Sequence, residues 1–172
     1  MKIKTAQSKD LERLYSFYDE VIAHQKLDEY SPEWTKDVYP SRNDLESFIE
    51  NDSFYFVEED QDIAAACVTR LHEDEIYLNA NWSRKFEENE IAVLHLFAVH
   101  PSFRRKGYSD KLLKYVIEDN RNKVKTIHLD VLKGNLPAFR LYEKIGFTYI
   151  GEYEVYYPDT GTIVVDLLEY IY

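Results

Sequence analysis

Residues 91–132 constrain the fold more than any other part of the chain. The run IAVLHLFAV (91–99) is almost entirely apolar, as expected of a central strand buried on both faces. Residues 109–121 follow with apolar side chains at helical spacing, and TIHLDVL (126–132) is a second buried strand. A strand, a helix and a strand in succession form a right-handed unit whose strands run parallel. The sequence therefore predicts a βαβ unit in the middle of a sheet.

The flanking segments predict further elements, in the overall order β-α-α-β-β-β-α-β-α-β-β. Strands are expected over 2–6, 146–157 and 161–172, and a hairpin of two strands is expected over 53–71 with its turn at 59–62. Helices are expected over 8–24, 41–50 and 136–145. Ser41 and Asp44 resemble a capping box at a helix start. Residues 72–90 are irregular and acidic, and a long internal loop is either functional or disordered. We expect one α/β domain, residues 1–172, with a mixed sheet flanked by helices.

Composition narrows the function classes. The chain has 32 acidic and 21 basic residues and a net charge of −11, which disfavours nucleic acid and anionic membranes as partners and suits a cationic ligand. The single cysteine, Cys67, lies in an apolar run and is expected to be a buried, inert thiol. The histidines lack metal-ligand spacing, so no metal is expected. No segment reads as a leader or a membrane span, which predicts a soluble, cytoplasmic protein.

A cluster of cations opposes the acidic balance of the chain. Arg104, Arg105 and Lys106 stand directly before Gly107, between the predicted strand and helix of the βαβ unit. The first N–H groups of a helix lack intrahelical partners, and glycine lets a ligand approach the backbone closely. From these residues alone, a phosphate or pyrophosphate site and a solvated basic loop are both open.

Further motifs carry a family resemblance. RRKGYS (104–109) resembles the Arg/Gln-x-x-Gly-x-Gly/Ala loop with which the GCN5-related N-acetyltransferases bind the pyrophosphate of acetyl-coenzyme A. LHLFAVHPSF is similar to that family's central strand, and LDVLKGNLPAFRLYEKIGFTYIGE to its second conserved block. Ser109 departs from the usual Gly or Ala, but serine is small and a competent N-cap. The resemblance covers residues 91–151 and implies the acyl-coenzyme A N-acyltransferase fold, with acetyl-coenzyme A as cosubstrate.

The resemblance also implies a set of cofactor-binding residues. The end of the central strand would pair with the pantetheine arm, and the loop would hold the pyrophosphate on backbone N–H groups. The implied residues are Phe97, Ala98, Val99, Arg104, Arg105, Lys106, Gly107, Tyr108, Ser109, Asp110 and Asn135. Asn135 is also suited to cap the helix ahead of Pro137. Lys144 would reach the adenosine phosphate or remain a surface lysine.

Tyr142 is the expected general acid. It lies seven residues after Asn135, so both residues occupy one face of a helix. The resemblance assigns Tyr142 the proton given to the departing thiolate. A phenol with a pKa of about 10 is able to donate to a thiolate whose conjugate acid titrates at about 8.5.

Two residues are candidates for the general base, which is needed because neutralising an alkylamine at pH 7 costs about 4.6 kcal/mol. Asp130 stands at the spacing of the glutamate base in the ribosomal-protein N-terminal acetyltransferases, although its shorter side chain favours a bridging water. His95 matches a histidine of the arylalkylamine acetyltransferases and is otherwise a core histidine. We rank Asp130 narrowly ahead.

The acceptor remains open between three hypotheses. The first is acetyl transfer to a primary amine of a small molecule, the second is transfer to the N-terminus of a peptide or protein, and the third is a non-catalytic coenzyme A sensor. Aromatic and acidic residues of three loops would form a cage for an ammonium group or simply pack together: Tyr30, Trp34, Trp82, Tyr156, Tyr157, Glu33, Asp37 and Glu87. The C-terminal run 163–172 would lend an edge strand to a homodimer.

Overall fold

The computed structural model describes residues 1–157 and 160–172 and confirms the predicted order of elements. The strands are β1 (Lys2–Thr5), β2 (Ser53–Glu59), β3 (Asp62–Leu71), β4 (Ile91–Val99), β5 (Thr126–Leu132), β6 (Thr148–Tyr157) and β7 (Gly161–Ile171). The helices are α1 (Leu11–His24), α2 (Arg42–Asn51), α3 (Tyr108–Asn120) and α4 (Leu136–Ile145). Within the described residues, no helix has the length and apolar character needed to cross a membrane.

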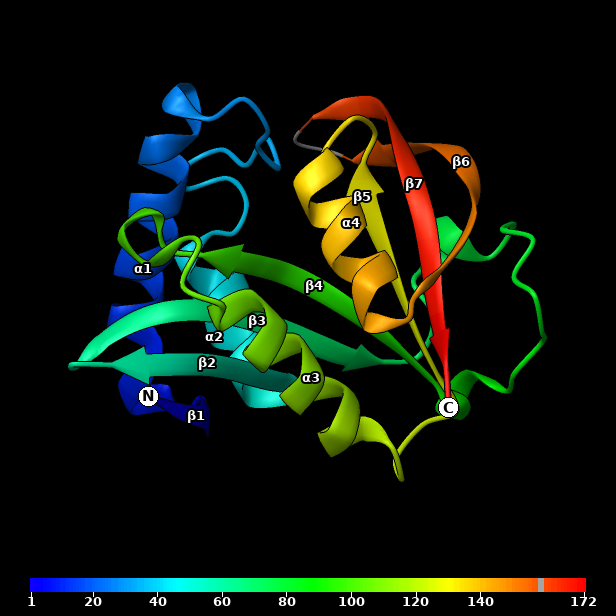
Figure 1. Cartoon of the computed structure of the whole chain (residues 1–172), viewed down its shortest axis with the longest axis horizontal. Helices are drawn as coiled ribbons and strands as arrows, with labels where there is room; N and C mark the ends of the chain where they lie inside the picture. Colours follow the sequence, from blue (N-terminus) through cyan, green and yellow to red (C-terminus); the bar gives the residue numbers. More distant parts are fainter. Residues whose placement is uncertain (158–159) are drawn as a thin grey trace.

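The strands form one mixed sheet in the order β1-β2-β3-β4-β5-β7-β6. Among the described strands, only β4 and β5 pair in parallel, which confirms the predicted βαβ unit. The expectation that the C-terminal strand offers an edge is wrong, because β7 lies between β5 and β6 and is paired on both sides (Figure 1). The hydrogen-bonding groups on both sides of β7 are therefore used inside the sheet.

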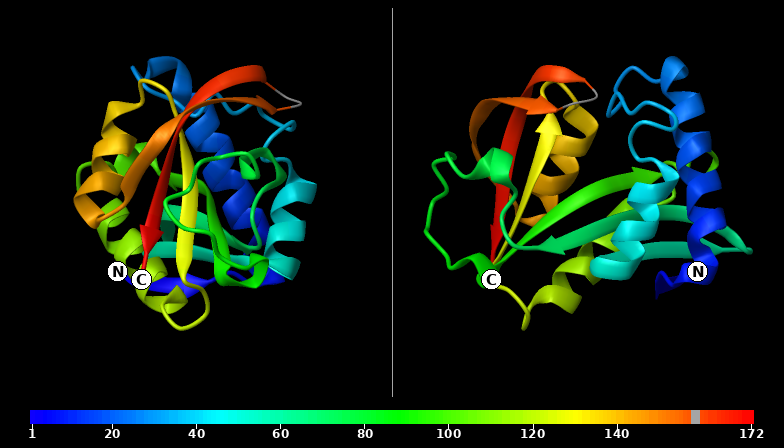
Figure 2. Two further views of the ribbon diagram at one scale, coloured as in Figure 1. Left: turned by 90° about the vertical axis from the view of Figure 1, so that its right-hand side faces the viewer. Right: turned by 180° about the vertical axis from the view of Figure 1, so that it is seen from behind.

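Helices cover both faces of the sheet. The core on one side gathers Leu112, Leu113 and Val116 of α3 with Ile127 and Leu129 of β5, and α4 joins it. The core on the other side joins apolar residues of α1 and α2 to β2 and β3. Figure 2 shows these two layers from behind and from the side. The segment between β3 and β4, in place of a helix, covers the remaining part of the second face.

The central strands separate, and this separation creates the site. β4 and β5 pair through only three residue pairs, the last being Val93 with His128. Beyond that pair the two strands diverge, as Figure 1 shows. The register between β3 and β4 also shifts, and Leu96 takes a φ of 53°. This bulge bends β4, and the buried hydroxyl of Tyr18 on α1 donates to the Leu96 carbonyl over 2.7 Å.

Candidate active site

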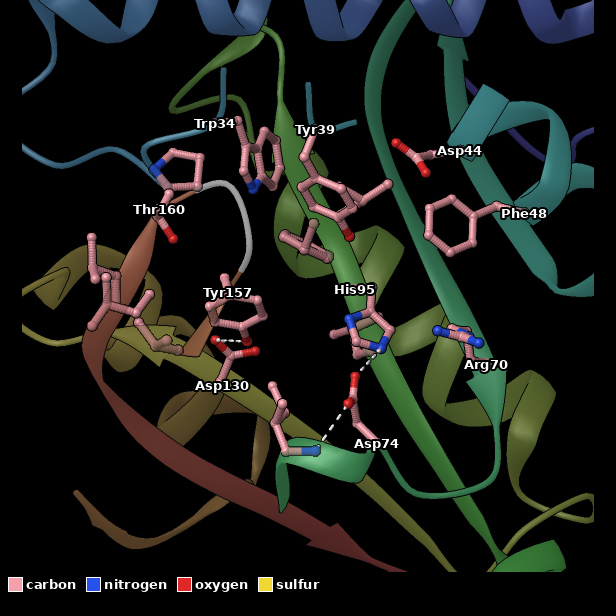
Figure 3. Close-up of a pocket in the computed structure, with 18 of the residues that line it drawn as sticks. Trp34, Tyr39, Asp44, Phe48, Arg70, Asp74, His95, Asp130, Tyr157 and Thr160 are labelled. Carbon is pink, nitrogen blue, oxygen red and sulfur yellow. Dashed lines mark hydrogen bonds and ion pairs between the residues drawn. The ribbon is translucent and has the colours of Figure 1, made fainter. Parts of the chain in front are cut away.

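A cavity of about 890 Å³ lies where β4 and β5 diverge. Its walls come from β4, β5, α2, α4, the α1–α2 connection and the β6–β7 hairpin (Figure 3). Among the described residues, the polar and aromatic side chains of the lining are Trp34, Tyr39, Asp44, Ser47, Phe48, Asn51, Asp52, Arg70, Asp74, His95, Phe97, Asp130, Asn135, Tyr142, Tyr156, Tyr157 and Thr160. The three sequence-predicted catalytic residues, Tyr142, Asp130 and His95, therefore share one cavity.

The cationic loop has the backbone of an anion-binding turn. Arg105 and Gly107 take left-handed conformations, with φ of 61° and 80°. Gly107 holds the N-cap position of α3, which begins at Tyr108, so Ser109 lies inside the helix and does not cap it. Within the described residues, the backbone N–H groups of 105–110 have no hydrogen-bond acceptor. Unpaired N–H groups at the start of a thirteen-residue helix favour an anion.

Arg104 has a partner inside the protein. Its guanidinium forms two hydrogen bonds with the Asp28 carboxylate, at 2.5 and 2.8 Å. Asp28 also lies 3.0 Å from Nδ1 of His24 at the end of α1. The hydrogen bond from Arg104 lowers the pKa of Asp28 below its ordinary value. Arg104 thus joins the loop to the α1–α2 connection, a pairing that no motif in the sequence predicts.

The other end of the loop is held by α4. Asp110, in the first turn of α3, accepts from Lys144 Nζ at 2.5 Å and lies 2.7 Å from Lys114 Nζ. The hydrogen bonds from these two lysines lower the pKa of Asp110. Lys144 therefore lies beside the first turn of α3, while Arg105 and Lys106 are exposed on the loop surface.

Tyr142 and Asn135 occupy one face of α4, as predicted from their spacing. The Tyr142 ring packs edge-to-face against Phe97 of β4 and against Phe147. Its hydroxyl has no hydrogen-bond partner among the described residues, and burial raises the pKa of the phenol well above its ordinary value. Asn135 caps α4 by accepting from the Ala138 N–H at 3.3 Å, which confirms its capping role.

Asp130 is held on β5 by two phenols. The Tyr77 hydroxyl donates to one carboxylate oxygen, and the Tyr157 hydroxyl donates to the other at 3.3 Å. Tyr77 is wholly buried and belongs to a short helical turn, η3 (Glu75–Tyr77), in the irregular segment between β3 and β4. The sequence analysis does not identify Tyr77 as a site residue. Asp74, which caps the turn that contains Tyr77, is a local sign of the turn but not of the contact with Asp130.

His95 lies across the cavity on β4. Its Nε2 atom is buried, lies 3.7 Å from Asp74 Oδ2 and has no hydrogen bond within the described residues (Figure 3). Burial lowers the pKa of His95, and the nearby carboxylates of Asp130 and Asp74 act in the opposite direction. The imidazole is therefore neutral near pH 7 and presents a nitrogen to the cavity.

The predicted aromatic cage forms only in part. Trp34, Tyr156 and Tyr157 line the cavity, but Tyr30 and Trp82 do not. The Trp82 indole, which belongs to the β3–β4 segment, stacks on His128 of β5, with ring centroids 3.6 Å apart and planes at 15°. The acidic residues of the lining are Asp44, Asp52, Asp74 and Asp130 rather than Glu33, Asp37 and Glu87. Among the described residues, no cluster of three or more His, Cys, Asp or Glu side chains is arranged to hold a metal.

Several curated proteins share part of this sequence. The [ribosomal protein bS18]-alanine N-acetyltransferase of Haemophilus ducreyi is 37% identical over 68 residues, which are 39% of this chain and 47% of that protein. The enzyme of the same name from Escherichia coli K12 is 36% identical over 70 residues, 40% of this chain and 47% of that protein. The chain thus matches about half the length of these curated relatives.

Solved structures share the whole fold. A GNAT-family acetyltransferase from Streptococcus agalactiae superposes with a TM-score of 0.76 at 20% identity, covering 99% of this chain and 95% of that one. The ribosomal-protein-S18-alanine N-acetyltransferase of Escherichia coli gives a TM-score of 0.69 at 22% identity, with 99% and 92% covered. The model of the acetyltransferase (GNAT) family matches residues 17–147, about three quarters of the sequence. The chain therefore belongs to the GNAT family of acetyltransferases.

Proposed function

We propose that this protein transfers the acetyl group of acetyl-coenzyme A to the N-terminal α-amine of a peptide or protein, within one ternary complex. The observation that carries the proposal is the pairing of Asp130 with Tyr77 and Tyr157, opposite His95 and in the same cavity as Tyr142. The similarity to bS18-alanine acetyltransferases supports this acceptor over a small-molecule amine.

The cavity and the loop fit the cosubstrate. Acetyl-coenzyme A supplies an acetyl group activated as a thioester. The N–H groups of residues 105–110 have no acceptor among the described residues, which suits the diphosphate. Beyond Val93, β4 has no ladder partner on its β5 side, so its backbone is available to an amide-bearing arm that enters between the strands. Phe97, Ala98 and Val99 lie in that stretch.

The basicity of the acceptor favours an α-amine. Neutralising an N-terminal amine with a pKa near 8 costs only about 1.4 kcal/mol at pH 7, against about 4.6 kcal/mol for an alkylamine. His95 is a weak base, because burial lowers its pKa. A weak base is matched to an amine that deprotonates easily.

Each candidate residue then has one task. Acetyl transfer exchanges a carbon–sulfur bond for a carbon–nitrogen bond, so one proton must leave the nitrogen and one must reach the sulfur. Asp130 or His95 accepts the first proton, directly or through a water. The Tyr142 hydroxyl, kept protonated by burial, donates the second. The remaining rate enhancement comes from holding the amine and the thioester together in one cavity.

A matched pair of peptides tests the acceptor. One peptide begins with alanine and has a free N-terminus; the other has the same sequence with a blocked N-terminus and one lysine. Thiol release and mass spectrometry report the extent and position of acetylation. We expect acetylation of the free N-terminus and none of the lysine. Acetylation of small alkylamines or of lysine alone would overturn the proposal.

A small cationic amine is the second candidate. Among the described residues of the lining there are four carboxylates and one arginine, Arg70, and this balance favours a positively charged acceptor of either kind. Faster turnover of free alkylamines than of peptides would support this candidate. Tight acetyl-coenzyme A binding without turnover of any amine would instead support the sensor hypothesis.

A further inference from the structure

The short segment 73–77, which contains the η3 turn, contacts both of the strands that diverge. Asp74 Oδ2 lies 3.7 Å from His95 Nε2 on β4. Three residues later, the Tyr77 hydroxyl donates to Asp130 on β5. One turn of chain thus reaches both candidate proton acceptors, from the same side of the cavity.

The register explains why such a contact is needed. Val93 and His128 form the last pair of the parallel ladder, and His95 and Asp130 each lie two residues beyond it. In a continuing ladder they would be cross-strand neighbours pointing to one face of the sheet. Because the strands separate after this pair, no backbone hydrogen bond between β4 and β5 fixes the distance between the two side chains.

We propose that segment 73–77 is a positioning element for proton transfer, in which Asp74 acts through His95 and Tyr77 acts through Asp130. The segment replaces the missing ladder and sets the two proton acceptors at a fixed separation across the cavity. The proposal deepens the proposed function and rests on it, because positioning matters only if an amine is deprotonated between these two residues.

The segment is itself anchored firmly enough for this role. Asp74 Oδ1 accepts from the Ile76 N–H at 3.2 Å, which fixes the carboxylate to its own turn. Glu73 lies 2.7 Å from Nδ1 of His128, and both side chains are more than nine-tenths buried. His128 in turn stacks on Trp82. The contact of Glu73 with His128 ties the segment to β5, and Tyr77 ties it to Asp130, a residue of β5 that lines the cavity.

The charges around His95 give the segment an electrostatic effect as well. Asp74, Asp130 and Glu73 favour the protonated imidazole, whereas burial and Arg70 oppose it. Asp74 therefore partly offsets the desolvation of His95 and keeps it a usable proton acceptor. Replacing Asp74 by asparagine removes this charge with little change in size.

Double-mutant cycles test whether Asp74 acts through His95 and whether Tyr77 acts through Asp130. The first cycle consists of Asp74→Asn, His95→Gln and the double variant. The second consists of Tyr77→Phe, Asp130→Asn and the corresponding double variant. We expect each positioning variant to lower kcat about tenfold in the wild-type background and less than about twofold when its partner is already replaced. The dissociation constant of acetyl-coenzyme A should not change. Equal fold-changes in both backgrounds, or no loss in either, would overturn the proposal.

Tyr55→Phe is the matched control for Tyr77→Phe. Tyr55 is also buried, and its hydroxyl donates to a carboxylate, Asp119, at 2.7 Å, outside the residues that line the cavity. Its removal should leave kcat unchanged. If Tyr55→Phe lowered kcat as far as Tyr77→Phe does, loss of a buried phenol anywhere would explain the effect, and the positioning role would be refuted.

A titration separates this proposal from the acetyl-transfer activity. The His95 imidazole is assigned by NMR from the signal that His95→Gln removes, and it is then titrated in wild type and in Asp74→Asn. The midpoint should move to lower pH in the variant, whether or not any acceptor is turned over. An unchanged midpoint would refute the role of Asp74 even in an active enzyme. A shifted midpoint with no acetyl transfer to any amine would refute the proposed function instead.

Discussion

Arg104 and Asp28 are joined by two hydrogen bonds that connect the β4–α3 loop to the α1–α2 connection. We expect Asp28→Asn to lower the free energy of unfolding by about 1–2 kcal/mol, because it leaves a half-buried guanidinium without its anion. Urea unfolding at pH 7 measures the change. Asp19→Asn, which removes an exposed pair with Lys36, should cost less than about 0.5 kcal/mol.

The same pair predicts a pH dependence. Arg104 lowers the pKa of Asp28 in the folded protein below the value of about 3.9 for an unfolded chain. The stability that the ionised carboxylate adds is therefore complete above the unfolded pKa and is lost as the pH falls through the lower folded pKa. The difference between wild type and Asp28→Asn should be constant from pH 7 to about 5 and shrink below about 4. A difference that grew on acidification would contradict this pairing.

Replacing Tyr142 by phenylalanine should separate catalysis from binding. The ring packs against Phe97 and Phe147, and phenylalanine preserves both contacts. Loss of the proton donor should lower kcat by about 10²- to 10³-fold. Calorimetry should show an unchanged affinity for acetyl-coenzyme A. Full activity of the variant would exclude Tyr142 as the acid.

Gly107→Ala should weaken cosubstrate binding through the backbone alone. A Cβ at this position meets no atom within 4 Å, but the φ of 80° is unfavourable for alanine by about 1 kcal/mol. Gly161→Ala is a matched control, since Gly161 has a φ of 75° and equally open surroundings. Both variants should lose similar stability in urea, whereas only Gly107→Ala should lose affinity for acetyl-coenzyme A. If the two variants had equal affinities for acetyl-coenzyme A, the result would argue against the loop as the diphosphate site.

Cys67 should be unreactive in the folded protein. It is wholly buried on β3, and burial raises the pKa of its thiol far above the ordinary value. Ellman's reagent at pH 8 should therefore detect no thiol in the native protein and the single cysteine after denaturation. Rapid labelling of native protein would contradict the packing of β3. An inert thiol also leaves the thiol-release assays above free of background.

Local patterns were sufficient to predict the elements of the fold. The apolar run of β4, the helical spacing of α3 and the Ser41–Asp44 capping box each reflect interactions between residues close in sequence, and each is confirmed. The position of β7 between β5 and β6 was not predicted. Pairing order depends on long-range packing, which the alternation of one strand does not encode.

The candidate site was predictable only where motifs covered it. Tyr142, Asp130 and His95 lie on regular elements that motifs in the sequence identify, and their chemical roles stay predictions. Asp74 and Tyr77 were missed because they come from an irregular segment and act on residues far along the chain; Tyr77 and Asp130 are 53 residues apart. The partner of Arg104 is 76 residues away, which no local pattern reveals.

The insertion of β7 has a consequence for how the protein is made. β7 pairs with β5 and with β6 along most of its length, so the sheet beyond β5 is continuous only once residue 171 is in place. During synthesis, β5, which carries Asp130, keeps one edge without its β7 partner until β7 has left the ribosome. The early half, from β1 to β4, is able to assemble first, and chaperone dependence should concentrate in that interval.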